Sequence, residues 1–194
     1  MTRDLDINNF PNIKKHIYSY KKIIDTRSTN RGEIQAALKL GKWWVVYSAK
    51  SPKTFEGEKI VCPQRSKVNK FAYQNGNFYA NRDVYYIRNK ISISLNLRFL
   101  TTILNSKLFY FWLKKKGKVK GESLELYHTP LSEIPIKLFE EKDIIYLANC
   151  LKNIEEKKNI RNINFNDMQI NNKIYELYKL TSEEIKYLEN FYPK

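Results

Sequence analysis

The sequence contains few residues of the kinds that form disulfide scaffolds and metal centres. Its 194 residues include two cysteines, Cys62 and Cys150, and two histidines, His16 and His128. Because the cysteines do not stand in a CxxC pair, a disulfide framework and a thiolate zinc site are excluded. Two histidines by themselves do not supply the three protein ligands of a metal site.

Glycine is also scarce, and no stretch of the chain is apolar enough to enter a membrane. None of the six glycines belongs to a GxGxxG or P-loop pattern, so the sequence shows no loop that cradles a nucleotide phosphate. No run approaches the ~18 uncharged apolar residues of a membrane span, and residues 1–10 lack the apolar segment of a signal peptide. We therefore expect a soluble protein of a reducing compartment, without a membrane partner.

Acidic residues are almost absent from the middle third of the chain. Residues 59–121 contain 14 basic residues and one acid, Asp83, which gives a net charge of +13. Residues 1–58 have 11 basic and 6 acidic groups (+5), and residues 122–194 have 10 and 13 (−3). A general compositional preference for lysine would spread the excess evenly. Its concentration in one third predicts a surface that binds a polyanion.

Hydrophobic patterning predicts a folded domain with strands in its first half. Aromatic residues make up 14% of the chain, which argues against intrinsic disorder. Pro11 is suited to the first turn of a helix, and Asn75-Gly76 between two aromatic runs is typical of a two-residue β-hairpin. The elements expected here are a helix over 12–26, strands over 43–47, 59–63 and 84–87, and a hairpin formed by 71–74 and 77–80.

The second half is predicted to be mainly helical. Apolar residues recur at helical spacing from Leu97 to Trp112, and the lysines at 114–116 followed by Gly117 are typical of a helix end. Thr181 with Glu184 forms a capping-box pattern. Other expected elements are a loop over 117–121, an extended piece between Pro130 and Pro135, and helices over 140–160, 166–179 and 182–190.

These elements together predict the α+β class. We expect a small mixed or antiparallel sheet, helices at both ends and a helical C-terminal tail. The tail contains an apolar stripe that we expect to be buried against the rest of the chain, because large apolar side chains are stabilised by burial. The stripe consists of Ile144, Leu147, Leu151 and Ile154.

Several side chains of the basic third are of the types that proteins use to bind DNA. Lysine and arginine contact phosphates and guanine edges, asparagine can pair with adenine, and serine can hold a phosphate. Arg65 is the preferred base-reading residue, because it follows Pro63 in a polar loop; an ion pair with Glu58 or Asp83 is the alternative. The candidate DNA-binding residues are Arg65, Ser66, Lys67, Lys70, Asn81, Arg82, Lys107, Lys114, Lys115, Lys116, Lys118 and Lys120. We expect seven of these to lie on one face: Arg65, Lys67, Lys70, Arg82, Lys107, Lys118 and Lys120.

Four segments resemble a known family of recognition domains. Residues 59–80 are similar to its strand, loop and hairpin, and residues 104–110 (Leu-Asn-Ser-Lys-Leu-Phe-Tyr) are similar to a characteristic helix. Residues 117–136 resemble its basic loop and the strand that follows, and residues 174–185 resemble its closing helices. The family is the TaqI-like C-terminal specificity domain, and the resemblance extends from about Phe10 to Tyr192.

The resemblance implies that the chain is the target-recognition domain of a restriction-modification enzyme. The parent would be an adenine-specific DNA methyltransferase, with or without a fused endonuclease, in the cytoplasm of a prokaryote. The implied partners are double-stranded DNA and a methyltransferase domain, either upstream in the same polypeptide or in a separate catalytic subunit.

The resemblance also implies a division of labour within the parent enzyme. S-adenosylmethionine, and magnesium for a nuclease, would bind the catalytic part, and this chain would hold no cofactor and no catalytic residue. Residues 1–139, with a core at 43–136, would form the recognition region. Residues 140–194 would form a helical region packed on it.

Three other functions remain compatible with the residues. A stand-alone nuclease would use Asp143, Glu156 and Lys158, although these residues fall on a predicted helix in the acidic third. An RNA-binding module would use exposed tyrosines of the strands as a stacking surface. A protein-interaction module would use residues 140–194 as its partner surface.

We predict that this chain by itself neither methylates nor cleaves DNA. It has no glycine-rich cofactor loop and no Pro-Pro dipeptide, whereas the family's methyltransferases carry an Asn/Asp-Pro-Pro-Tyr/Phe motif in their catalytic domain. The chain is incubated with duplex DNA and labelled S-adenosylmethionine, and separately with duplex DNA and magnesium. Turnover that reaches one product per protein molecule in either assay would contradict the prediction.

Overall fold

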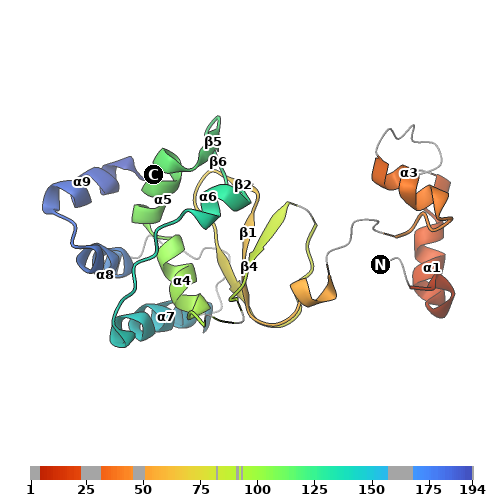
Figure 1. Ribbon diagram of the computed structural model, residues 1–194, viewed down its shortest axis with the longest axis horizontal. Helices are drawn as coiled ribbons and strands as arrows, with labels where there is room; N and C mark the ends of the chain where they lie inside the picture. The colour runs from red at the N-terminus through yellow and green to blue at the C-terminus, as the bar shows by residue number, and fades with distance from the viewer. Residues whose placement is uncertain are drawn as a thin grey trace. The chain divides into compact units, whose positions relative to one another are not determined.

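The computed structural model describes residues 5–22, 32–45, 51–81, 83–90, 92, 94–156 and 168–193. The chain divides into two compact units, Met1–Thr54 and Phe55–Lys194. The second unit contains two small antiparallel sheets together with helices (Figure 1), so the predicted α+β class is confirmed. A separate recognition region over 1–139 stays a prediction.

The first unit is helical. Its elements are the 3-10 helices η1 (Ile7–Asn9) and η2 (Pro52–Thr54) and the α-helices α1 (Pro11–Tyr18) and α3 (Gly32–Lys39). Pro11 occupies the first turn of α1, as expected. The predicted helix is interrupted: α1 ends at Tyr18, residues 19–20 form a turn in which the Ser19 hydroxyl donates to the His16 carbonyl at 2.6 Å, and residues 21–22 are helical again. Residues 23–26 of the expected helix lie outside the described residues.

The strand expected at 43–47 is not formed where the structure describes it. Residues 43–45 lie in a turn in which the Val45 amide donates to the Lys42 carbonyl at 3.0 Å. The rings of Trp43 and Trp44 meet edge to face, with centroids 6.0 Å apart. The aromatic run therefore packs as a turn, and residues 46–47 lie outside the described part of the chain.

The first sheet has the strand order β3-β1-β4, with β1 (Lys59–Pro63) in the centre. β3 (Ala72–Gln74) and β4 (Val84–Ile87) pair with it antiparallel, in registers that include Ile60 opposite Tyr73 and Val61 opposite Tyr86. Ile60, Val61 and Cys62 are buried. The strands predicted at 59–63 and 84–87 are therefore confirmed.

The hairpin predicted at Asn75-Gly76 is wrong. β3 pairs with β1, and residues 77–80 form no strand. The reason is the fully buried ammonium of Lys59, which donates to the carbonyls of Gly57 at 2.5 Å and Gly76 at 2.6 Å. Gly76 has a φ of 95°, which favours glycine, and its carbonyl is held against the start of β1.

The second sheet is formed by three short strands in the order β2-β6-β5. β2 is Arg65–Ser66, β5 is Lys118–Lys120 and β6 is Ser123–Glu125. Part of the predicted loop over 117–121 is therefore the edge strand β5, which turns back into β6 at Gly121, whose φ is 61°.

The extended piece expected between Pro130 and Pro135 is also wrong in its first part. The structure has the short helix α6 (His128–Ser132) there, and residues 133–140 belong to no helix or strand. Pro130 falls within the first turn of α6, where its missing N–H costs nothing.

Two helices, α4 (Leu97–Leu104) and α5 (Lys107–Lys116), occupy the segment predicted as one. The helix is interrupted at Asn105 and Ser106. The Ser106 hydroxyl accepts from the Phe109 amide at 3.4 Å and caps α5. Asn105 caps the end of α4, and its side chain turns into the core.

The break is held by buried polar side chains, which we call the α4–α5 junction: Asn69, Asn105, Ser106 and Asn171. The Asn105 amide donates to the Phe71 carbonyl at 2.8 Å and accepts from the Phe71 N–H at 2.9 Å. Asn69 donates to the carbonyls of Leu104 and Ser106, and Asn171 accepts from the Lys107 N–H at 3.0 Å. The junction joins the approach to β3, both helices and the C-terminal tail.

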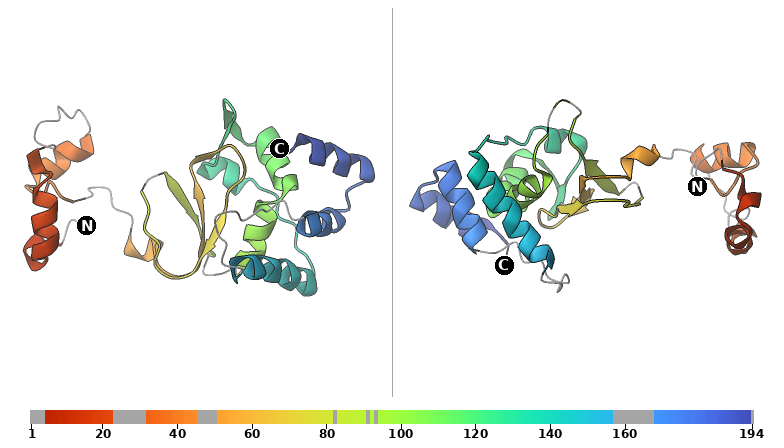
Figure 2. Two further views of the ribbon diagram at one scale, coloured as in Figure 1. Left: turned by 180° about the vertical axis from the view of Figure 1, so that it is seen from behind. Right: turned by 90° about the horizontal axis from the view of Figure 1, so that it is seen from below.

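The tail consists of α7 (Glu141–Glu156), α8 (Met168–Tyr178) and α9 (Ser182–Phe191). α7 packs along α4 (Figure 2). Leu147 and Leu151 are buried, and Ile144 and Ile154 are half-buried against the same core, so the predicted apolar stripe is confirmed.

Two further features of the helices agree with the sequence. The capping box at the start of α9 is present: the Thr181 hydroxyl accepts from the Glu184 amide, and the Glu184 carboxylate accepts from the Thr181 amide at 2.7 Å. In the described part of the chain, no helix combines the length and the apolarity that a transmembrane span requires.

We predict that replacing Asn105 by alanine destabilises the larger unit by roughly 2–4 kcal/mol. The substitution leaves the buried N–H and carbonyl of Phe71 without their partners, and an unsatisfied buried polar group costs about 1–3 kcal/mol. Urea unfolding followed by circular dichroism measures the change. The matched control is Asn153→Ala on the exposed side of α7, which we expect to change stability by less than ~0.5 kcal/mol. Equal midpoints for the two variants would contradict the role of the junction.

Candidate nucleic-acid interface

The β2-β6-β5 sheet places a carboxylate between two cations. In its register, Glu125 of β6 lies opposite Arg65 of β2 on one side and opposite Lys118 of β5 on the other. Because side chains alternate along a strand, the buried Leu124 faces the core and Glu125 faces away from it. Glu125 is nevertheless only 3% exposed. The side chains that cover it must therefore come from its neighbours on the same face.

Three side chains contact the Glu125 carboxylate. Arg65 Nε donates to Oε1 at 3.1 Å, and Lys118 Nζ lies 3.3 Å from Oε2. The Tyr127 hydroxyl donates to Oε1 at 3.2 Å and accepts from Arg65 Nη2 at 3.0 Å. We call these four residues, Arg65, Lys118, Glu125 and Tyr127, the Glu125 network.

The Glu125 carboxylate is ionised at neutral pH. Burial raises its pKa, but the hydrogen bonds from its three partners outweigh burial, so the pKa lies below the ordinary value. One negative charge therefore faces two positive charges, and the network retains a net positive charge. Arg65 and Lys118 keep 49% and 66% of their side-chain surface exposed, so both cations remain open to a ligand.

Further lysines surround the β5–β6 turn. Lys67 Nζ lies 3.3 Å from a Glu122 carboxylate oxygen, and Lys114 Nζ donates to the Glu122 carbonyl at 2.9 Å. Lys120 is exposed and has no partner among the described residues. With Arg65 and Lys118 these residues form what we call the basic sheet face: Arg65, Lys67, Lys114, Lys118 and Lys120.

Four of the seven cations expected on one face are thus brought together: Arg65, Lys67, Lys118 and Lys120. Lys107 is not. It stands at the start of α5, about 15 Å along the helix from β5, forms an ion pair with Glu189 of α9 and is only 15% exposed. Lys70 is exposed on the approach to β3, and the structure gives it no contact with this face; Arg82 lies outside the described residues.

Of the remaining candidates, all except Lys116 have local partners or lie half-buried. The Asn81 amide and carbonyl oxygen are both used in a turn with Asp83, at 3.1 and 3.0 Å. Lys115 Nζ lies 5.2 Å from the centre of the Phe191 ring, while Lys116 is exposed at the end of α5. Ser66 is half-buried in β2. Whether any of these residues contacts DNA stays a prediction.

The ion pair considered for Arg65 is present, but its partner differs from the expected ones. Glu58 accepts a hydrogen bond from the Tyr73 hydroxyl, and Asp83 bonds with Asn81. Glu125, 60 residues along the chain from Arg65, takes their place. Sequence reasoning missed Glu125 and Tyr127; the available signal was a pair of acids, Glu122 and Glu125, immediately after a segment of 63 residues with one acid.

The alternative nuclease site is not assembled. Asp143 and Glu156 lie thirteen residues apart on α7, which separates them by about 20 Å along the axis. Asp143 forms an ion pair with Lys173 at 3.0 Å. Lys158 lies outside the described residues. Within the described ranges, no group of three or more His, Cys, Asp or Glu side chains is placed to hold a metal ion.

The tyrosines of the first sheet do not form an open stacking surface. Tyr73 is buried, and Tyr85 and Tyr86 are half-buried. The cue that would favour single-stranded RNA, a row of exposed strand tyrosines, is therefore absent from β3 and β4.

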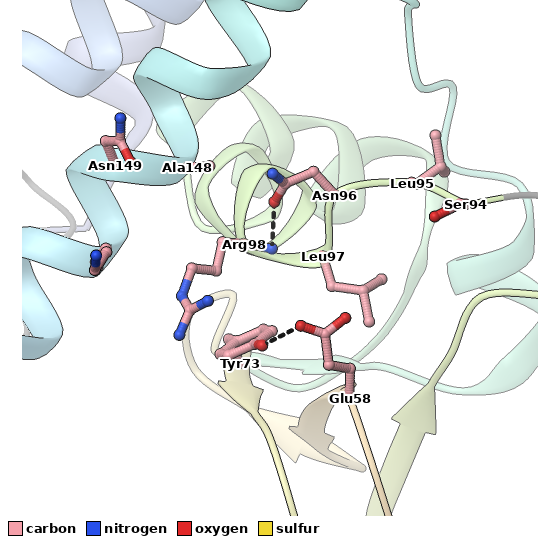
Figure 3. A pocket seen from close by; sticks show the side chains of 10 residues that line it. Glu58, Tyr73, Ser94, Leu95, Asn96, Leu97, Arg98, Ala148 and Asn149 are labelled. Atoms are coloured by element: carbon pink, nitrogen blue, oxygen red, sulfur yellow. Dashed lines mark hydrogen bonds between the residues drawn. The ribbon is translucent and has the colours of Figure 1, made fainter.

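A polar pocket of about 440 Å³ lies between β3, the start of α4 and α7 (Figure 3). Arg98 lies over the Tyr73 ring, 4.0 Å from its centroid, and donates through Nε to Glu155 at 3.2 Å. Burial and a hydrogen bond to Glu58 raise the pKa of Tyr73 to about 12. Glu58 and Glu155 balance Arg98 and Lys152 here, so the pocket does not concentrate positive charge as the basic sheet face does.

Part of the chain is similar to two type II methyltransferases. Over 85 residues the chain is 31% identical to the type II methyltransferase M.HincII of Haemophilus influenzae and 31% identical to the type II methyltransferase M.HindII of Haemophilus influenzae strain Rd. Each alignment covers 41% of this chain, and 17% and 16% of the two relatives. The aligned part of the chain thus spans less than a fifth of the length of these relatives.

The sequence also matches the TaqI-like C-terminal specificity domain over residues 5–136. The matched residues include β2, β5 and β6, and with them the Glu125 network. Because the match covers more than half of the chain, this protein belongs to the family of TaqI-like C-terminal specificity domains.

Proposed function

We propose that this chain is the DNA target-recognition domain of a restriction-modification enzyme, an adenine-specific DNA methyltransferase. The observation that carries the proposal is the basic sheet face, on which cations from β2, the residue after it, β5 and the end of α5 gather around the β5–β6 turn. Membership of a specificity-domain family and likeness to type II methyltransferases support the same function.

The cations of this face suit two different tasks in binding a duplex. Lys120 and Lys67 are exposed and have flexible side chains, so their ammonium groups can neutralise phosphates along the DNA backbone. Arg65 has a planar guanidinium whose fork can pair with both acceptors of a guanine edge. Phosphate contacts would set the position of the domain on the duplex, and Arg65 would contribute to the choice of sequence.

Catalysis belongs to another part of the parent enzyme in this proposal. S-adenosylmethionine, and magnesium where an endonuclease is fused, would bind that part, because this sequence has no glycine-rich loop and no Pro-Pro motif. The catalytic part is either a methyltransferase domain in the same polypeptide or a separate subunit. Residues 122–194 carry a net charge of −3, which is less suited to DNA than the basic third. Their helices α7–α9 instead complete the hydrophobic core against which the sheets pack.

We predict that the chain binds duplex DNA with an affinity that falls steeply with salt, because phosphate neutralisation releases counterions. With Z phosphate contacts, log K falls against log[salt] with a slope of about −0.9Z. The double substitution Lys118→Ala and Lys120→Ala should weaken binding to all duplexes and flatten the slope by up to ~2. Fluorescence anisotropy over a salt series measures both effects.

The matched control is the double substitution Lys142→Ala and Lys152→Ala. Both lysines are exposed on α7, and Figure 1 shows α7 at the bottom and β5 at the top of the larger unit. We expect the control to leave the slope unchanged. Absence of duplex binding at low salt, or an affinity that does not depend on salt, would overturn the proposed function; equal slopes for the two double variants would overturn only the assignment of Lys118 and Lys120.

A further inference from the structure

The guanidinium of Arg65 is fixed along one edge and open along the other. Nε donates to Glu125 Oε1 at 3.1 Å, and Nη2 lies 3.1 Å from the same oxygen and donates to the Tyr127 hydroxyl at 3.0 Å. The carboxylate that holds it is 3% exposed, whereas the Arg65 side chain is 49% exposed. The anchor is therefore inside the protein and the free edge faces solvent.

The free edge retains a fork of hydrogen-bond donors. An arginine has five N–H groups, and two of those of Arg65 are used in the Glu125 network. The others are both N–H groups of Nη1 and one of Nη2. Nη1 has no partner among the described residues. Two adjacent donors in one plane match a pair of acceptors in one plane.

The anchor itself cannot easily move. Glu125 is fixed by its place in the central strand β6, and Lys118 holds its second oxygen from the opposite side. Tyr127 bridges the carboxylate and the guanidinium. A free arginine side chain loses rotamer entropy when it is ordered by a ligand, and a side chain that is already held loses less.

The presence of Glu125 is unfavourable for phosphate binding. A carboxylate on a basic face repels phosphates, and it partly neutralises the positive charge with which Arg65 and Lys118 would attract them. A face that served affinity alone would be better without it. A fixed and correctly oriented guanidinium, by contrast, is what discrimination between bases requires.

We propose that Glu125 is a positioning residue for sequence recognition, which holds Arg65 so that its free edge pairs with the N7 and O6 acceptors of a guanine in the major groove of duplex DNA. The proposal rests on the function proposed above. It gives Glu125 opposite effects on two measurable quantities: it lowers the affinity for duplexes in general and raises the preference for one sequence.

The test begins with a library of duplexes that have a randomised core, from which the wild-type chain selects its preferred sequence. Anisotropy then compares the selected duplex with a scrambled one for wild type and Glu125→Gln. Glutamine keeps the shape but is a weaker, neutral acceptor. We expect the variant to bind the scrambled duplex at least as tightly as wild type, with a salt slope steeper by up to about 1, and to lose about tenfold in discrimination.

A second measurement locates the contact. Each guanine of the selected duplex is replaced in turn by 7-deazaguanine, which lacks the N7 acceptor. At one position we expect the replacement to weaken wild-type binding about fivefold, and to have less than about half of that effect on Glu125→Gln and on Arg65→Ala. A residue with a purely structural role would not alter the response to one atom of the DNA.

The control for charge is Glu122→Gln. Glu122 is 84% exposed and pairs with Lys67 at 3.3 Å, without contact to Arg65. The Glu122→Gln substitution removes one negative charge from the same face, as Glu125→Gln does. It should therefore steepen the salt slope and leave the discrimination between the two duplexes as in wild type. If thermal melting shows that Glu125→Gln does not fold, Tyr127→Phe is tested in its place. This substitution removes only the hydroxyl that bridges Arg65 and Glu125, and we expect it to lower discrimination several-fold.

The outcomes separate the two proposals. If the wild-type chain selects a sequence and Glu125→Gln discriminates as well as wild type, or loses affinity for both duplexes alike, the positioning role is overturned and the recognition function stands. If Tyr127→Phe is tested in place of Glu125→Gln and discriminates as well as wild type, the positioning role is likewise overturned. If the wild-type chain enriches no sequence and binds no duplex, the recognition function itself is overturned.

Discussion

The larger unit depends on two hydrogen bonds that satisfy a pair of buried backbone groups. The N–H and carbonyl of Phe71 approach the core at the start of β3, and the side-chain amide of Asn105 satisfies both. Asn105 does this from the C-cap of α4, and α5 starts as a separate helix from the Ser106 cap. The direction of α5 in turn sets where β5 begins, and thereby where Lys118 and Lys120 lie.

The same balance between burial and charge governs the basic sheet face. A buried carboxylate without partners would be costly, and Glu125 is tolerated because the register of β6 places a cation opposite it on each side. The exchange is mutual, since the carboxylate orders the guanidinium of Arg65, whose outer edge stays open. In the proposed function, attraction for phosphate and choice of base would therefore fall to different side chains of one small sheet, the exposed lysines and the anchored arginine.

Patterns that depend on neighbouring residues predicted the structure well. The apolar runs of β1 and β4, the stripe of α7 and the capping box of α9 are all formed, because each depends on spacing within one segment. The predictions that failed involve partners distant in sequence. The turn at Gly76 is bound by Lys59 instead of closing a hairpin, and the long helix predicted after Asn96 is divided by its bonds to Phe71, Asn69 and Asn171.

The candidate site shows the same division between sequence and structure. The sequence alone determined that the positive charge is concentrated in residues 59–121, and this follows from composition without any knowledge of the fold. Tertiary structure alone decided which of those cations gather. Arg65 and Lys118 meet because β2 and β5 flank β6, while Lys107 is taken by Glu189 of α9. Pairing between strands and helices far apart in the chain is set by packing of the whole core, and a local pattern of residues contains no record of it.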